Sequence, residues 1–265
     1  MLGAAHLEPS LVVVAVTAGL AVGVGMDGGQ LALLMGAVLS GQLSVGWSND
    51  WIDARRGRDD GRPDKPAATG AVARTTVQRA AVGALAVTIA TSSVLGVVPG
   101  SLHLLAVALA WAYNAALKDT VWSPVSYLVA FGLLPVVVTT AAGAGWPAWW
   151  AVVAAACFGA GVHAANVLPD LERDRAQGIG GLPQRLGASG AVAMAVGFLG
   201  TGTATALLGP GHGTPLVAAA TTLVLLIAVV AAHRAGRARL AFRLSMATGL
   251  LLVATLVARG SQLTG

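Results

Sequence analysis

Residues 29–53 read GQLALLMGAVLSGQLSVGWSNDWID, and the part from 29 to 48 contains no charged residue. About 20 apolar residues in a helix are enough to cross the hydrocarbon core of a bilayer. The rest of the 265-residue chain has the same character, because 56% of it is hydrophobic and only 10% is charged, whereas a soluble domain has about 25% charged residues. The composition excludes an ordinary soluble globular protein and a disordered chain, and it predicts a protein that crosses a membrane several times.

The apolar runs are continuous and rich in Ala, Leu, Val and Gly, which favours helices over the alternating strands of an outer-membrane barrel. The first run lacks a basic start and a clear cleavage site, so we expect a retained helix rather than a signal peptide. The single cysteine, Cys157, excludes a disulfide framework. We therefore predict an all-α bundle of nine transmembrane helices that forms one domain over residues 1–265. The expected spans are 10–26, 29–48, 76–98, 101–117, 121–141, 147–168, 188–208, 214–233 and 240–258.

Two long polar loops, at about 49–75 and 169–187, follow the second and sixth spans, so nine spans place both loops on the same side of the membrane. All of the 16 Lys and Arg residues except Arg259 fall on that side. The positive-inside rule makes it cytoplasmic, with the N-terminus inside and the C-terminus outside. The net charge of +5 reflects this bias, and we predict no nucleic-acid partner. Abundant Ala, Gly and Arg favour a bacterial source and a cytoplasmic-membrane location.

The acidic residues are concentrated in these two loops. Asn49 and Asp53 are four residues apart, and so are Asn166, Asp170 and Asp174. A spacing of four places side chains on one helix face, so each set is expected to line a helix that extends from its span into the cytosolic interface. The alternative is that these acids are solvated and balanced by neighbouring arginines. Most of the 11 acids belong to the two loops: Asp50, Asp53, Asp59, Asp60, Asp64, Asp170, Glu172 and Asp174.

Two facing carboxylate clusters suit Mg²⁺, which takes oxygen ligands and substrate phosphates. The arginines and Lys65 would bind the remaining charge of a diphosphate. A diphosphate at the interface and an apolar tail inside the bundle describe an isoprenyl diphosphate. Cleavage of its carbon–oxygen bond requires charge neutralisation on the leaving group and an apolar chamber around the allylic cation.

At these residues the sequence resembles the UbiA superfamily of intramembrane prenyltransferases, whose members share nine helices and two cytosolic aspartate-rich motifs. The segment Asn49-Asp50-Trp51-Ile52-Asp53, with Arg62-Pro63-Asp64-Lys65-Pro66 and Gly70, resembles the first motif. The segment Asp170-Leu171-Glu172-Arg173-Asp174, with Gly178 and Arg185-Leu186-Gly187, resembles the second, and Tyr113-Asn114 is also similar to the family. The chain departs from the family pattern at Gly57, where an aspartate is usual, and in lacking a lysine shortly after the second motif. Arg62 and Arg185 are the expected substitutes for that lysine.

The resemblance implies a role for each matched residue. The expected Mg²⁺ ligands are Asn49, Asp53, Asp170 and Asp174. The expected diphosphate-binding residues are Arg62, Lys65, Arg185, Asp50, Asp60 and Asn166. The expected catalytic residues are Asp53, Asp170, Asp174 and Tyr113. Two of the candidates have open alternatives, since Tyr113 could be an interfacial belt residue and His163 either lines the site or packs between helices.

The leading interpretation is a Mg²⁺-dependent prenyltransferase that transfers the prenyl group of an isoprenyl diphosphate to an aromatic or other lipophilic acceptor within the lipid bilayer. A terpene cyclase of the same superfamily, which needs no acceptor, is the alternative. A secondary transporter is disfavoured, because transporter sites usually lie near the bilayer midplane and these acids lie at one membrane face.

Overall fold

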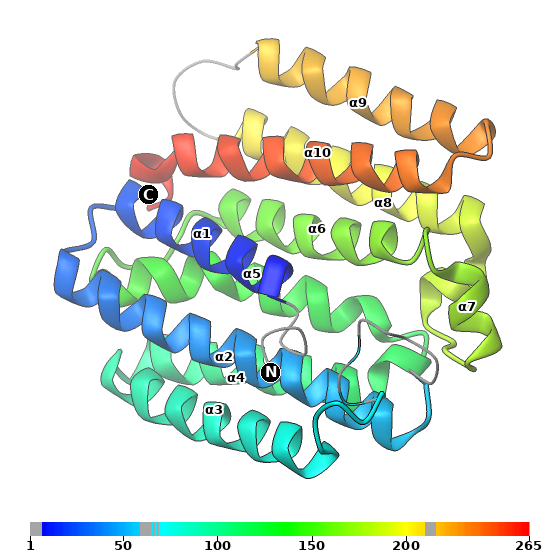
Figure 1. Ribbon diagram of the computed structural model, residues 1–265. Coiled ribbons are helices and arrows are strands. Elements are labelled where there is room, and N and C mark those ends of the chain that lie inside the picture. Colours follow the sequence, from blue (N-terminus) through cyan, green and yellow to red (C-terminus); the bar gives the residue numbers. More distant parts are fainter. Residues whose placement is uncertain (1–6, 59–64, 66, 68, 210–215, 265) are drawn as a thin grey trace.

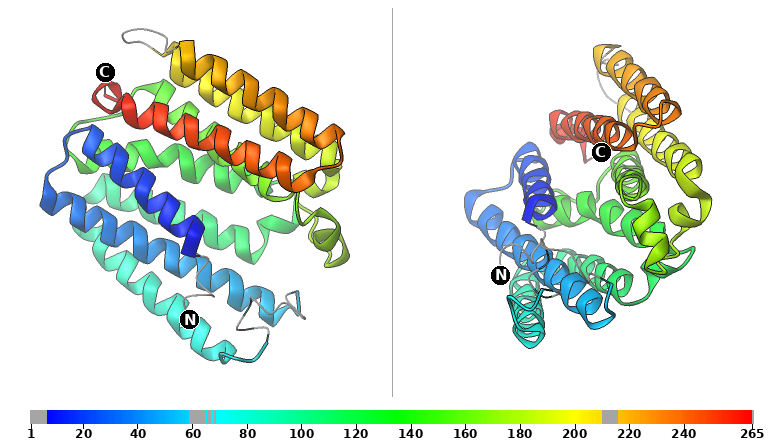
Figure 2. Two further views of the ribbon diagram at one scale, coloured as in Figure 1. Left: turned by 45° about the horizontal axis from the view of Figure 1, so that its top comes forward. Right: turned by 45° about the vertical axis from the view of Figure 1, so that its right-hand side comes forward.

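The computed structural model describes residues 7–58, 65, 67, 69–209 and 216–264, and in this part of the chain the secondary structure is helical apart from one isolated bridge between Pro147 and Thr264. The long helices run side by side in one bundle (Figures 1 and 2). They are α1 (Leu7–Gly23), α2 (Gly28–Arg55), α3 (Arg74–Val94), α4 (Val97–Ala115), α5 (Ser123–Ala141), α6 (Trp149–Asn166), α8 (Leu182–Leu208), α9 (Leu216–Arg234) and α10 (Ala238–Ala258). The short helices are η2 (Leu117–Asp119), α7 (Leu171–Ala176) and η3 (Gly260–Gln262).

Of the helices in the described ranges, 7 are long and apolar enough to cross a membrane: α2, α3, α4, α5, α8, α9 and α10. Helix α1 has a shorter apolar part, Ser10–Gly23. Helix α6 is 18 residues long, and most of its side chains are buried among the other helices. The prediction of an all-α protein is confirmed. The count of nine spans and the extent of the single domain stay predictions.

Helix α6 lies in the middle of the bundle and packs against α5, α8 and α10. Its small residues make this close packing possible. A Cβ atom added at Gly159 would lie 2.6 Å from the backbone oxygen of Tyr127 on α5, and one added at Gly161 would lie 2.7 Å from Cγ of Leu199 on α8. Small side chains at helix contacts let membrane helices approach closely. Residues near the end of α6 are therefore held at fixed positions relative to both neighbours.

Polar side chains join α2 to α4 inside the bundle. The indole Nε1 of Trp111 donates a hydrogen bond to Ser44 Oγ at 2.8 Å. The amide nitrogen of Asn114 donates to Ser48 Oγ at 2.8 Å and to the backbone oxygen of Val45 at 3.0 Å. Such interhelical hydrogen bonds stabilise helix pairs in a membrane, where an unsatisfied polar group is costly. They hold the end of α2, with the first acidic motif, beside the end of α4.

The two acidic motifs differ in backbone structure. Asn49 and Asp53 lie on the unbroken α2, as the spacing predicts. The prediction that Asn166, Asp170 and Asp174 share one continuous helix is wrong, because α6 ends at Asn166 and α7 begins only at Leu171. Pro169 causes this break, since proline has no N–H for the helical hydrogen bond and disfavours helical geometry in the residue before it.

The far end of the bundle contains Arg259, the one basic residue that the sequence assigns to that face. Its guanidinium donates hydrogen bonds to the backbone oxygens of Ala206 and Gly209, the latter at 2.9 Å, and lies 4.4 Å from the ring centroid of Trp150. The last carbonyls of a helix have no partner within the helix. Arg259 therefore supplies hydrogen bonds to backbone carbonyls at the C-terminal end of α8 and links this end to Trp150 of α6.

Candidate active site

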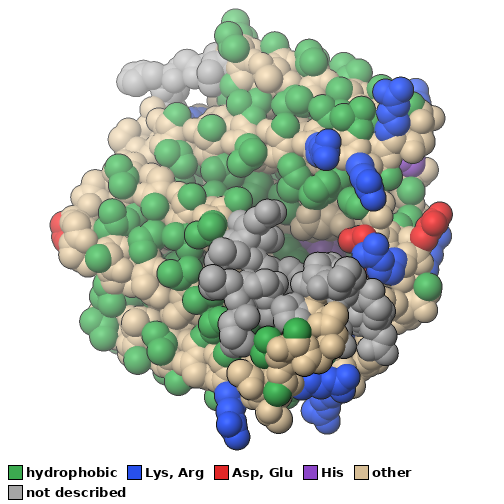
Figure 3. All heavy atoms as spheres, viewed as in Figure 1, with side chains coloured by type: hydrophobic (Ala, Val, Ile, Leu, Met, Phe, Trp, Pro, Cys, Tyr) green, Lys and Arg blue, Asp and Glu red, His purple; other side chains and the backbone are tan. Residues whose placement is uncertain are grey.

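The residues of both acidic motifs lie at one end of the bundle, on the right in Figure 1, where α2 ends and where η2, α7 and the start of α8 connect the long helices. On the face seen in Figure 3, most Lys and Arg side chains also lie toward this end, while hydrophobic side chains cover much of the remainder. The end of the bundle thus combines acids and bases at the rim of an apolar protein.

The first motif contains two buried carboxylates, each paired with a buried lysine. Asp50 is 1% exposed and accepts a hydrogen bond from Lys65 Nζ. Asp53 is 8% exposed and accepts one from Lys118 Nζ. Burying a charge is costly unless it is paired. These are the only two lysines of the chain, and both are next to aspartates that are separated by less than one helical turn.

Arg58 and Asp119 extend the ion pairs around Asp53. The guanidinium of Arg58 is 2.8 Å from Asp119 Oδ2 and 3.9 Å from Asp53 Oδ1. Arg56 also approaches Asp119 Oδ2, at 3.5 Å. The other carboxylate oxygen of Asp119 is buried and has no hydrogen-bond partner among the described residues. Asp53 is therefore surrounded by two cations, one of which is shared with Asp119.

The amide of Asn49 faces α4. Its Nδ2 donates a hydrogen bond to Asn114 Oδ1 at 3.3 Å, and Asn114 is fixed to α2 by the two bonds described above. The contact leaves the amide oxygen of Asn49 as its possible contribution to a metal.

The second motif is more exposed than the first. Asp170 precedes α7 and forms an ion pair with Arg173 at 3.0 Å, with both side chains about half exposed. Asp174 is partly buried and accepts a hydrogen bond from Gln184 Nε2 at 2.8 Å. Burial raises the pKa of the Asp174 carboxyl, and the negative charge of Asp170 acts in the same direction, whereas the Gln184 hydrogen bond opposes the increase. The side-chain oxygen of Gln184 is buried without a hydrogen-bond partner in the part of the chain described.

Lys118 connects the two motifs electrostatically. It forms the ion pair with Asp53 of the first motif, and its positive charge also favours the ionised form of Asp174 in the second. Burial lowers the pKa of the Lys118 amine, and the charge of Asp53 opposes this. The structure therefore brings one carboxylate from each motif within the field of a single buried ammonium group.

Aromatic side chains lie directly beside these charged groups. The phenol of Tyr113 interacts electrostatically with Asp53 and Asp174. Its ring meets the ring of Tyr127 edge-on at 5.1 Å, and Tyr127 stacks on His163 at 4.5 Å. Tyr113 therefore belongs to an aromatic cluster formed by α4, α5 and α6, within the electrostatic range of an acid from each motif.

His163 is 2% exposed, and its Nε2 is 3.1 Å from Ser123 Oγ. The same hydroxyl accepts a hydrogen bond from the backbone N–H of Leu182 at 3.1 Å. His163 is thus fixed at the junction of α5, α6 and α8, and its ring forms part of the aromatic cluster.

The remaining predicted residues are placed as follows. Asn166 is exposed at the end of α6. Arg185 is exposed, and its guanidinium donates to the backbone oxygens of Gly180 at 2.6 Å and Asp119 at 3.5 Å, which brings it to the rim of the charged region. Arg62 and Asp60, together with Asp59 and Asp64, lie outside the described residues.

The described residues contain no group of three His, Cys, Asp or Glu side chains that could hold a metal ion on their own. Asp53, Asp119 and Asp174 are the buried or partly buried carboxylates whose charges interact with Lys118, and Asp170 is close to Asp174 along the chain. A metal at this place would therefore need oxygen ligands from elsewhere, such as a phosphate or water, in addition to these carboxylates.

Sequence reasoning missed Lys118, Asp119 and Gln184. Lys118 carried a usable signal, because it is one of two lysines and follows Tyr113-Asn114 by a few residues at the end of a predicted span. Asp119 is the acid next to it. Gln184 carried none, because its contact with Asp174 depends on the turn after α7.

Comparison with known proteins gives one family and several solved structures of similar fold. A family model described as the UbiA prenyltransferase family matches residues 10–258. The apo structure of a UbiA homologue from Aeropyrum pernix K1 is 22% identical, with a TM-score of 0.71, and the match covers 95% of this chain and 98% of that one. None of the curated proteins matches the chain in sequence.

A UbiA homologue from Archaeoglobus fulgidus matches in two structures with different ligands. The one bound to DMAPP and Mg²⁺ is 18% identical, with a TM-score of 0.74 and 97% of both chains covered. The one bound to GPP and Mg²⁺ is 15% identical, with a TM-score of 0.73, and the match covers 96% of this chain and 99% of that one. At these identities the likeness establishes the fold.

Proposed function

Because this chain belongs to the UbiA prenyltransferase family, a family of multi-pass membrane proteins, we propose that it is an intramembrane Mg²⁺-dependent prenyltransferase. The substrate would be an isoprenyl diphosphate and the acceptor an aromatic or other lipophilic molecule. The observation that carries the proposal is the position of Lys118, whose charge acts on a carboxylate from each acidic motif. A buried cation that is paired with an acid of one motif and acts at longer range on an acid of the other suits an anionic ligand with a bound metal.

The donor groups at the site fit Mg²⁺, which prefers oxygen ligands and retains waters or phosphate oxygens. Asp53, Asp170 and Asp174 would supply carboxylate oxygens, and Asn49 an amide oxygen. Bound Mg²⁺ would neutralise part of the diphosphate charge. The raised pKa of Asp174 supports this assignment. Burial makes the ionised carboxylate less stable, and a divalent cation beside it would stabilise that ionised form.

The protein's own cations would hold the diphosphate. Lys118 and Lys65 are buried beside the first motif, and Arg58 lies next to them. Lys118 would take the place of the lysine that is missing after the second motif. When the carbon–oxygen bond of the substrate breaks, the bonding electrons remain on the diphosphate, and these ammonium and guanidinium groups stabilise the charge that develops there.

The aromatic cluster would stabilise the positive charge on the other fragment. Aromatic ring faces attract cations, more strongly where water is excluded. Tyr113 is the ring next to the carboxylates, and Tyr127 and His163 follow it into the bundle. The acceptor would then attack the allylic carbon and lose a proton.

We further propose that α1 to α6 and α8 to α10 are nine membrane spans, with the N-terminus, both motifs and η2 on the cytosolic side. The concentration of basic residues at this end of the bundle supports this orientation. Diphosphate substrates would then enter from the cytosol.

The test is to incubate the purified protein in lipid with DMAPP, GPP and longer allylic diphosphates, with Mg²⁺ or with a chelator, and to analyse the reaction by mass spectrometry. We expect Mg²⁺-dependent release of diphosphate and a prenylated product that forms only when an acceptor is added. A product without acceptor would identify a cyclase instead. If no diphosphate is released from any substrate, the proposal is refuted.

A further inference from the structure

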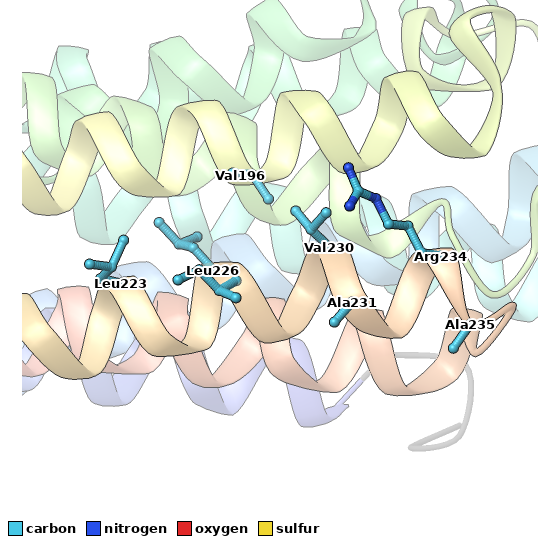
Figure 4. Close-up of a pocket in the computed structure, with 8 residues that line it drawn as sticks. Val196, Leu223, Leu226, Val230, Ala231, Arg234 and Ala235 are labelled. Atoms are coloured by element: carbon cyan, nitrogen blue, oxygen red, sulfur yellow. The ribbon is translucent and has the colours of Figure 1, made fainter.

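A groove on the outer surface of the bundle is separate from the candidate active site. It lies between α8 and α9, encloses about 730 Å³, and is open to the side (Figure 4). Its walls are Val196 from α8 and a row of apolar residues from α9. The α9 residues are Leu223, Leu226, Ile227, Val230, Ala231 and Ala235.

One charged residue, Arg234, lines the groove. Its side chain extends from α9 toward α8 at the end of the row of apolar residues (Figure 4). At the same end, Ser189 Oγ on α8 and His233 Nε2 on α9 lie 3.1 Å apart. The groove is therefore apolar along its length and cationic at the end that carries the acidic motifs and the other basic residues.

The cation in this groove has no acidic partner among the residues that the structure describes. Arg234, Arg237, Arg239 and Arg243 are all exposed in the turn between α9 and α10 or next to it, and none forms an ion pair with a described residue. Residues 175–265 contain no Asp or Glu at all. The groove thus offers positive charge that no described acidic side chain neutralises.

We propose that this groove binds an anionic phospholipid, with an acyl chain along α9 and the phosphate on Arg234. An apolar channel with a single cation at its interfacial end matches an amphiphile that has a hydrocarbon tail and a negative headgroup. Basic sites between membrane helices at the cytoplasmic side are suited to anionic headgroups. The lipid would fill the space that α8 and α9 leave between them and hold α9 against the bundle.

The test uses the full-length protein with equal amounts of phosphatidylglycerol and phosphatidylcholine that carry the same acyl chains, and native mass spectrometry counts the lipids retained. We expect the wild type to retain phosphatidylglycerol in preference. Arg234→Ala should reduce that preference about fivefold, the effect of one basic residue near an anionic lipid, and Arg234→Lys should keep most of it.

Two further variants separate this site from general surface charge. Arg79→Ala removes an exposed arginine from α3 at the same end of the bundle, and it should leave the preference unchanged. Ala231→Trp fills the groove and should reduce retention of both lipids. Equal retention of the two lipids by the wild type, or equal effects of Arg234→Ala and Arg79→Ala, would overturn the proposal.

A competition experiment distinguishes the phospholipid from an isoprenyl diphosphate, which is also an anionic amphiphile. Excess GPP should not displace the phosphatidylglycerol. Displacement that depends on Arg234 would assign the groove to the prenyl substrate and refute the phospholipid proposal. The outcome does not depend on whether the enzyme turns over.

Discussion

Replacement of Lys118 by methionine tests the site most directly, because it removes the charge and keeps most of the side-chain length. Lys118 is 5% exposed and paired with Asp53. Removing one partner of a fully buried pair costs about 3–5 kcal/mol. Arg58 remains 3.9 Å from the same carboxylate oxygen, so we expect a smaller loss in the free energy of unfolding, of about 2 kcal/mol.

Lys118→Met should lower kcat/KM by more than the smaller fraction of folded protein accounts for. A hydrogen bond to a charged group contributes about 1.5–3 kcal/mol, which corresponds to a decrease of roughly 10- to 150-fold in kcat/KM for the diphosphate. Steady-state kinetics at a temperature where the variant is folded would measure it. Arg56→Met is the matched control, since it removes a charge from a more exposed ion pair at the same end and should change kcat/KM little.

The pH dependence provides a second measurement on the same residue. Burial lowers the pKa of Lys118 from 10.5, so the folded protein releases this proton at a lower pH than the unfolded chain does. Activity should therefore fall at alkaline pH, while the free energy of unfolding rises through the window between the lowered pKa and 10.5. Lys118→Met should lack both effects. If it is folded and has wild-type kcat/KM and the same alkaline limb, Lys118 is not part of the site.

Gln184→Leu removes the hydrogen bond that keeps the pKa of Asp174 from rising further, so the acid limb of the kcat/KM profile should move to higher pH; an unchanged limb would exclude this role. Gly159→Ala places a Cβ 2.6 Å from a backbone oxygen of α5, and it should lower the free energy of unfolding by about 1–3 kcal/mol in a thermal unfolding measurement. The control Gly36→Ala has no atom within 4 Å of the added Cβ and should raise the free energy of unfolding by up to about 1 kcal/mol. In a cysteine-free background, a cysteine placed at Gly180 should react with an impermeant label only from the cytosolic side, and labelling from outside would contradict the proposed orientation.

Much of the architecture could be predicted from the sequence, because membrane helices follow from continuous apolar runs. The second predicted span is an example, since α2 contains it and continues without interruption through Asn49 to Asp53. The helix break in the second motif was also readable, because Pro169 stands between Asn166 and Asp170 and the spacing of four holds only in an unbroken helix.

The pairing within the site could not be predicted in the same way. Asp53 and Lys118 are 65 residues apart, and their contact depends on how the end of α4 packs against α2. The polar contacts that fix this packing, such as those of Asn114 with Ser48, are single hydrogen bonds without a sequence period. For Arg62 and Asp60, which lie outside the described residues, the diphosphate-binding role stays a prediction.

The two buried lysines give the site its own counter-ions. Lys118 is paired with Asp53, which the proposed function assigns to the metal. Binding of a metal diphosphate is then an exchange, in which the Asp53 carboxylate passes from the ammonium group to the metal and the ammonium group passes to the phosphate. A metal ion that took Asp53 alone would remove the ion pair of the buried Lys118 ammonium, whereas a diphosphate that arrives with the metal replaces it. The arrangement thus favours the two arriving together, and because the net charge of the region changes little, the affinity should depend only weakly on ionic strength.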